Sequence, residues 1–174
     1  MNIFVLDEDP IIAARYHCDK HIAKMILESL QIICTVYHKE INRKLMVSYD
    51  SSLEDLRNQI PYRATHQNHP STIWAGESLE NLKWLKELTK ELNREYKRRF
   101  GSPENHKSYE VLFKLPTMSF MFPFEGLTPF AQAVADDCRH EDAVVAYRKY
   151  YKLYKHHIAY WRNGTPEWFT KDFQ

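Results

Sequence analysis

The sequence has little glycine, little cysteine and almost no excess of charge. Only four of its 174 residues are glycine, which argues against a turn-rich β-sandwich and against glycine loops that cradle phosphate. Its three cysteines, Cys18, Cys34 and Cys138, form no CxxC pair and leave an odd number. We therefore expect no disulfide framework and a reducing, cytoplasmic environment. The formal net charge is +1, so the overall charge of the chain does not indicate binding to nucleic acid or to a membrane.

Long apolar runs are absent as well. The opening MNIFVL is apolar, but acids follow at positions 7–9, and no stretch is long enough to span a bilayer. We therefore expect neither export nor membrane insertion. The residues of the chain are 44% hydrophobic and 14% aromatic. This composition excludes a disordered chain and provides enough apolar side chains for one hydrophobic core. We predict a single domain over residues 1–174.

Apolar residues recur every three or four positions along much of the chain, and this spacing predicts helices. The expected helices span residues 9–37, 53–60, 69–100, 128–135 and 142–162, and the only strand candidate is 3–6. The fold class predicted is therefore all-α, a compact helical bundle with three long helices and irregular loops. In the last helix, the tyrosine stripe has the spacing of a buried face.

The first long helix carries one narrow polar stripe. At about 100° per residue, its polar side chains fall within one arc of the circumference. These residues are His17, Lys20, His21, Lys24, Glu28, Gln31 and Thr35. The rest of the circumference is apolar, so the helix is expected to be central, with its stripe facing a cleft or other polar groups.

Two interpretations of this stripe compete. It could be a solvated face with ordinary pairs four residues apart, such as Lys24 with Glu28. It could instead be the wall of an active site, with a histidine as acid or base and Glu28 as a carboxylate. His17 and His21 also have the spacing of a zinc-binding pair, but no HExxH motif or cysteine pair accompanies them. We predict no cofactor, with zinc or iron as the alternative.

Three further segments contain candidate residues. Thr65, His66 and His69 precede a helix start, where they could receive an anion or where His69 could simply cap the helix. Basic residues that could contact DNA phosphates are Arg94, Lys97, Arg98, Arg148, Lys149 and Lys152. The segment 116–124 is rich in phenylalanine and methionine; it could wedge into a base stack, or it could be an irregular loop over the core.

Several segments together resemble a family of small phage-borne proteins, some of which are described as pyrimidine-dimer DNA glycosylases. The segments are MNIFVLDEDP, HCDKH, THQNHPSTIWA, LTPFAQA and PEWF. The true dimer glycosylases, of the endonuclease V type, are more distantly similar. They are small all-helical domains with a histidine-bearing first helix and a tail rich in lysine and tyrosine. Residues 14–17 and 147–151 are similar to those two parts.

The resemblance implies a mechanism. In that family the N-terminal α-amine attacks C1′ of the damaged nucleotide, forms a Schiff base and cuts the strand by elimination, with a glutamate assisting. Alpha-amines suit this work because they titrate at about pH 8, which leaves a usable neutral fraction. Aligned on His17, the family's glutamate falls on Lys24, and Glu28 lies one turn further along. Asn2 is a poor context for removal of Met1.

Three functional hypotheses follow. The first is a DNA glycosylase and lyase acting on damaged or modified pyrimidines, with His17, His21, Lys24 and Glu28 in the pocket and Lys24 or the Met1 amine as nucleophile. Lys20 would lie beside it. The second is an enzyme of nucleotide or base modification that acts on a small molecule. The third is a non-catalytic protein-binding module. The partner expected is DNA or a nucleotide, in the host cytoplasm if the chain is phage-encoded.

Overall fold

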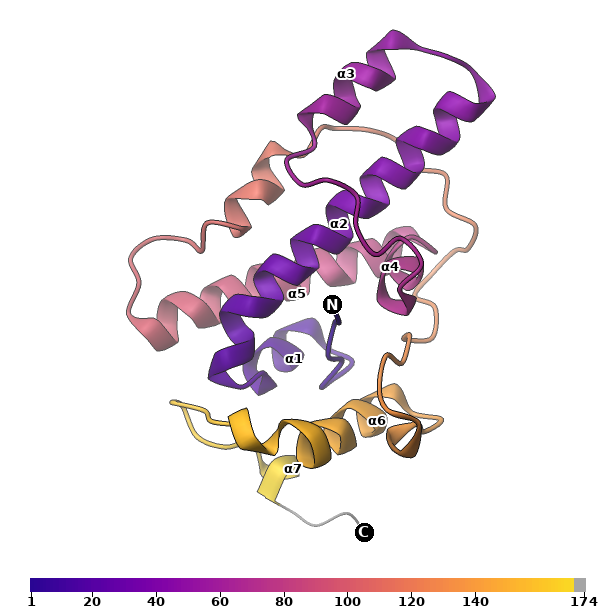
Figure 1. Ribbon diagram of the computed structural model, residues 1–174. Coiled ribbons are helices and arrows are strands. Elements are labelled where there is room, and N and C mark those ends of the chain that lie inside the picture. The colour runs from indigo at the N-terminus through magenta and orange to yellow at the C-terminus, as the bar shows by residue number, and fades with distance from the viewer. Residues whose placement is uncertain (171–174) are drawn as a thin grey trace.

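The computed structural model describes residues 1–170, and the regular structure within them is entirely helical. This confirms the predicted all-α class. Two long helices, α2 (Asp19–Val47) and α5 (Leu79–Phe100), cross and pack against each other (Figure 1). The shorter helices are α1 (Pro10–Tyr16), α3 (Ser51–Gln59), α4 (Pro70–Ala75), α6 (Ala143–Tyr150) and α7 (Glu167–Thr170). The short helices of other types are the 3₁₀ helices η1 (Tyr109–Lys114), η2 (Asp136–Cys138) and η4 (His156–Ile158) and the π-helix η3 (Tyr151–Lys155).

The expected strand 3–6 is extended, but within residues 1–170 it pairs with no other strand. It runs through the middle of the molecule beside α1 and α2 (Figure 1). Ile3, Val5 and Leu6 are each no more than 1% exposed, so this segment is part of the core. Side chains, and not a neighbouring strand, provide hydrogen-bond partners for the backbone of this segment. Arg148 Nε, for example, donates to the Leu6 carbonyl at 2.9 Å.

The helix predicted over 9–37 is two helices, and this part of the prediction is wrong. His17 and Cys18 are extended, with ψ of 135° and 158°, and separate α1 from α2. The last carbonyls of α1 are satisfied from outside the helix, since Arg99 donates to the carbonyls of Arg15 and His17. The first amide of α2 donates to the Tyr160 carbonyl at 2.8 Å. After this break α2 continues ten residues beyond the predicted end, to Val47.

The helix predicted over 69–100 is also divided, into α4 and α5. Ser78 begins α5 by accepting a hydrogen bond from the Asn81 amide at 3.0 Å. Gly101 ends it in the left-handed conformation, with φ of 62°, so the predicted end at residue 100 is confirmed. The short helix predicted at 53–60 is confirmed as α3.

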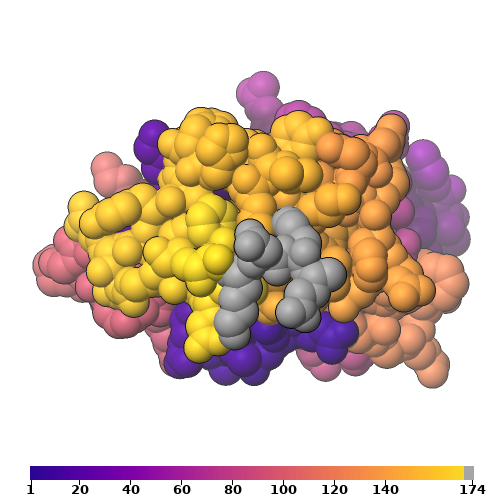
Figure 2. All heavy atoms as spheres, turned by 90° about the horizontal axis from the view of Figure 1, so that it is seen from below, coloured from indigo at the N-terminus to yellow at the C-terminus, as the bar shows by residue number. Residues whose placement is uncertain are grey.

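The C-terminal third differs most from expectation. No helix forms at 128–135, because Thr128 is bound by its neighbours instead: its amide donates to Asn81 Oδ1 and its hydroxyl to Glu77 Oε2. The third long helix is irregular in its second half: the α-helix α6 stops at Tyr150, and the chain continues as the π-helix η3 and the 3₁₀ helix η4 to Ile158. The predicted burial of its tyrosine stripe is confirmed at Tyr147 and Tyr151. Seen from below, these C-terminal segments form most of one face of the molecule (Figure 2).

Candidate active site

The N-terminal amine lies beside the polar stripe of α2. The Met1 nitrogen is 3.8 Å from Glu28 Oε2. The next backbone nitrogen, that of Asn2, donates a hydrogen bond to the same oxygen at 2.8 Å. Glu28 therefore holds the first two residues of the chain on the face of α2. Its side chain is 13% exposed and that of Met1 is 2% exposed, so the carboxylate is mostly buried but still reaches solvent.

A second amine approaches the other oxygen of this carboxylate. Lys24 Nζ is 3.5 Å from Glu28 Oε1, one helical turn away, and the Lys24 side chain is 61% exposed. The pair predicted from the spacing of four residues is thus present. It is more than an ordinary surface pair, because the same carboxylate also binds the start of the chain.

Asn2 and Tyr147 fix the position of the first residues. Asn2 Nδ2 donates to the Ala133 carbonyl at 2.8 Å, and the Tyr147 hydroxyl is 3.0 Å from Asn2 Oδ1. That hydroxyl also lies 2.9 Å from the Ala131 carbonyl and accepts from the Ala133 amide at 3.1 Å. Burial raises the pKa of Tyr147 to about 12, so its hydroxyl remains a donor throughout the neutral range. Sequence periodicity indicates only that Tyr147 is buried and carries no signal for this polar role.

We expect Tyr147→Phe to loosen the N-terminal segment while keeping the ring in the core. The change leaves the partly buried Ala133 amide without its acceptor, which costs about 1 kcal/mol of stability. Urea denaturation measures this loss, and exchange of the Asn2 amide proton measures the loosening. Tyr154→Phe is the matched control, because the Tyr154 hydroxyl binds Asp137 on the surface. Equal effects of the two changes would contradict the positioning role of Tyr147.

The polar segment with Thr65, His66 and His69 leads into the start of α4, near the Met1–Glu28 pair. His69 Nδ1 accepts from the Ser71 amide at 3.2 Å, so His69 caps the helix as one of the two interpretations predicted. The pKa of His69 is lowered, mainly by burial and also by the positive Met1 amine. Thr65 and His66 lie in the preceding segment; they hydrogen-bond each other, and the Thr65 amide donates to Thr35 Oγ1 at 3.1 Å. His69 thus lies near enough to the Met1 amine and Glu28 for their charges to affect its pKa, whereas Thr65 is bound to α2 further along.

The two histidines of the stripe are in the core. His17 is fully buried, and its Nδ1 donates to the Ala13 carbonyl at 2.7 Å. His21 is 3% exposed, stacks on Phe4 with 4.6 Å between ring centroids and hydrogen-bonds the Tyr151 hydroxyl. Burial is the main cause that lowers the pKa of His17 to about 4 and that of His21 to about 3. Both rings are therefore neutral at pH 7, and they form a cluster distinct from the Met1–Glu28 pair.

These histidines predict acid sensitivity. Their folded-state pKa values lie below the unfolded value of 6.5, so the unfolded chain takes up protons first as the pH falls. The stability that depends on these neutral rings is complete above pH 6.5 and is lost from there down to about pH 4 for His17 and about pH 3 for His21. We expect a loss of about 1.4 kcal/mol per histidine for each pH unit in this window. Urea midpoints between pH 7 and 5 measure it; His21→Asn should roughly halve the slope, and an unchanged midpoint at pH 5 would contradict the account.

The basic residues predicted to contact DNA lie on three elements, and several already have partners. On α5, Arg94 pairs with Glu91 at 2.5 Å and Arg98 with Glu95 at 2.6 Å, while Lys97 lies in the last turn. On α6, Arg148 pairs with Asp7 at 3.2 Å, and Lys149 donates to the Asp137 carbonyl. Lys152 follows in η3. Lys20 is exposed on α2, one turn before Lys24.

The cysteine thiols are not activated as nucleophiles. All three cysteines are buried, and burial raises the pKa of each thiol, that of Cys34 to about 11. Within residues 1–170, no three histidine, cysteine or carboxylate side chains are grouped closely enough to hold a metal ion. The nucleophiles that this site offers are therefore amines.

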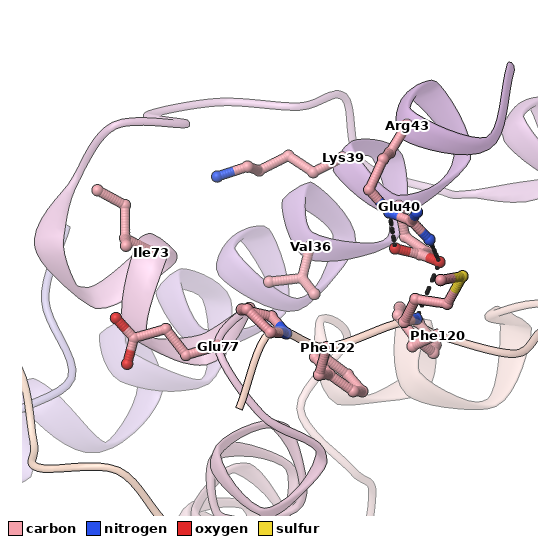
Figure 3. Close-up of a pocket in the computed structure, with 11 residues that line it drawn as sticks. Val36, Lys39, Glu40, Arg43, Ile73, Glu77, Phe120 and Phe122 are labelled. Atoms are coloured by element: carbon pink, nitrogen blue, oxygen red, sulfur yellow. Dashed lines mark hydrogen bonds and ion pairs between the residues drawn. The ribbon is translucent and has the colours of Figure 1, made fainter. Parts of the chain in front are cut away.

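A separate aromatic cavity lies further along α2. The segment 120–123 closes it against Val36 and Ile73, with a volume of about 350 Å³ (Figure 3). Phe120 and Phe122 stack in parallel with 5.3 Å between centroids. Glu40 is bound on three sides, by Arg43, by Lys44 and by the Met121 amide. The aromatic segment thus packs against the core and lines a cavity.

Comparisons with known proteins do not assign the chain: no family model, curated protein or solved structure matches it. None of the helices formed by residues 1–170 combines the length and the apolar character needed to cross a membrane.

Proposed function

We propose that this protein is a Schiff-base DNA glycosylase and lyase that acts on damaged or modified pyrimidines. The observation that carries the proposal is one carboxylate with an amine at each oxygen: the Met1 amine at 3.8 Å and Lys24 Nζ at 3.5 Å from Glu28. An amine held beside a general base is the arrangement that amine nucleophiles need. The family resemblance of the sequence supports the same chemistry.

The proposed reaction proceeds in two stages. A neutral amine attacks C1′, its nitrogen–carbon bond forms, and the glycosidic bond breaks with its electron pair leaving on the base, which takes up a proton. Glu28 then takes a proton from the attached amine and passes it to O4′ as the bond from C1′ to O4′ breaks, which opens the sugar ring, gives the protonated imine and returns Glu28 to its carboxylate form. In the second stage Glu28 removes a proton from C2′, and the bond from C3′ to the phosphate oxygen breaks, which releases the phosphate. Glu28 is placed to serve both amines as this base.

Met1 and Lys24 offer different nucleophiles. The Met1 amine is held in place through Asn2, which is anchored to Ala133 and Tyr147, and a positioned nucleophile gains rate because its orientation is already set. Lys24 is exposed and flexible, so its amine reaches a bulky substrate more easily. The family resemblance favours the N-terminal amine. Mapping the covalent adduct to one residue or the other distinguishes the two nucleophiles.

Borohydride trapping tests the proposal. The protein is incubated with duplexes that carry a pyrimidine dimer or an abasic site, and borohydride reduces any imine to a stable amine. We expect a covalent adduct that mass spectrometry maps to the N-terminal residue or to Lys24. Lys24→Arg and an N-terminal extension by one glycine separate the two amines, because each removes one nucleophile from its position. Absence of an adduct with both duplexes would remove the lyase mechanism.

One observation favours the second candidate, an enzyme that modifies free nucleotides. The net charge is only +1, and Arg94, Arg98 and Arg148 are already ion-paired within the chain, which leaves less positive charge for a duplex. A nucleotide that raises the melting temperature when a duplex does not would favour this candidate over the first.

A further inference from the structure

A polar basin lies between α2, the end of α3 and the segment that leads to α4. Its volume is about 570 Å³. The polar side chains that line it are His38, Asn42, Arg57, Asn58, Arg63 and Gln67. No carboxylate is among the lining residues, so the basin combines positive charge with amide groups.

The arginines of this basin are unusual in lacking acidic partners. Of the ten arginines in the sequence, seven form ion pairs within residues 1–170. The three others are Arg15, Arg57 and Arg63, and two of these three line the same basin. Two guanidinium groups without carboxylates form a strong site for a phosphate, because each presents a planar fork of donors to its oxygens.

The wall that carries Arg63 is fastened on both sides. His38 Nε2 hydrogen-bonds the Tyr62 carbonyl at 2.9 Å. Thr35 Oγ1 accepts from the Thr65 amide and donates to the Thr65 carbonyl, both at 3.1 Å. The backbone on either side of Arg63 is thus bound to α2, which limits the entropy lost when a ligand binds.

The basin faces the same side of α2 as the Met1–Glu28 pair. Asn42 follows Lys24 by 18 residues, which is about five helical turns, so the two side chains leave the helix in the same direction. His38 is ten residues beyond Glu28, a rise of about 15 Å. At about 3.4 Å of duplex axis per phosphate of one strand, that span corresponds to about four nucleotides.

We propose that Arg57 and Arg63 bind a phosphate group in this basin. Resting on the proposed function, we further propose that it is a backbone phosphate of a DNA strand that runs along α2, about four nucleotides from the reacting one. This phosphate would set the register of the strand over Glu28. A free nucleotide phosphate offers the same chemistry, and the test below distinguishes the two sources.

The test compares two double variants that each lose two positive charges. Arg57→Gln/Arg63→Gln removes the basin's charge, and Lys83→Gln/Arg139→Gln removes two exposed charges that are paired with Glu80 and Asp136. Fluorescence anisotropy with a labelled duplex gives the Kd over a range of salt concentrations. We expect the basin variant to bind roughly tenfold or more weakly. Its slope of log K against log salt should be shallower by about 1–2.

A second ligand separates the sources, with inorganic pyrophosphate as the probe and melting temperature as the readout. If pyrophosphate stabilises the wild type but not the basin variant, and no duplex binds, the basin is a phosphate site whose ligand is a free phosphate compound and not DNA. If the two double variants behave alike with both ligands, the proposal is overturned. Borohydride trapping tests the lyase chemistry independently of phosphate binding. If the duplex binds through the basin but no adduct forms, the phosphate site is supported and the lyase chemistry is contradicted. Circular dichroism of both variants checks that they are folded.

Discussion

Replacing Arg99 by methionine is expected to lower the free energy of unfolding by about 3–5 kcal/mol. The Arg99 side chain is 1% exposed and pairs with Asp19 at 3.0 Å and Glu95 at 2.8 Å. It also donates to the carbonyls of Arg15 and His17. Methionine keeps most of the length of the side chain, so the loss comes from polar groups rather than from a cavity. The carbonyls of Arg15 and His17 lose their donor, and the buried carboxylates of Asp19 and Glu95 each lose one of two arginine partners.

Urea denaturation measures this loss, and the neighbouring residue provides the control. Arg98 also pairs with Glu95, at 2.6 Å, but its side chain is 55% exposed. Water therefore replaces it readily, and Arg98→Met should cost less than about 1 kcal/mol. A similar cost at both positions would show that burial of Arg99 does not hold α1 and α2 together.

Replacing Glu28 by glutamine is expected to slow formation of the borohydride adduct by about 10²–10⁴-fold. Glutamine has the same size and can still bind the Asn2 amide, so the fold and the N-terminal anchor remain. An amide cannot take up the proton that the attacking amine and C2′ must lose. The rate of adduct formation with an abasic duplex measures this effect.

Glu87→Gln is the matched control for Glu28→Gln. Glu87 pairs with Lys90 at 2.8 Å on the surface of α5, so the change removes one carboxylate from a lysine pair that contains no terminal amine. Its adduct rate should equal that of the wild type. If Glu28→Gln also kept the wild-type rate, the carboxylate would be no more than an anchor for the N-terminus.

The sequence determined those features that depend on neighbouring residues along the chain. The end of α5 at Phe100 followed from the end of the apolar pattern along the chain. The pairing of Lys24 with Glu28 followed from one turn of helix. Burial of Tyr147 and Tyr151 followed from their spacing of four residues. Each of these depends on interactions within about one helical turn, and periodicity reports such interactions directly.

The tertiary structure alone decided the features that join distant segments. The break between α1 and α2 depends on Arg99, more than 80 residues away, which satisfies the carbonyls that a continuous helix would have bonded internally. The failure of 128–135 to form a helix depends on Asn81 and Glu77 in the same way.

The site itself shows the same division. Its carboxylate and one amine lie on a single helix, and the sequence placed them together. The Met1 amine reaches Glu28 because Asn2 is held by Ala133 and by Tyr147, which is 145 positions away. His17 and His21 share the polar stripe of the sequence, but the packing of Phe4 and Tyr151 places His21 in the core. Helical spacing assigns a residue to a face, and only the segments packed on that face decide whether it meets water, a partner or a substrate.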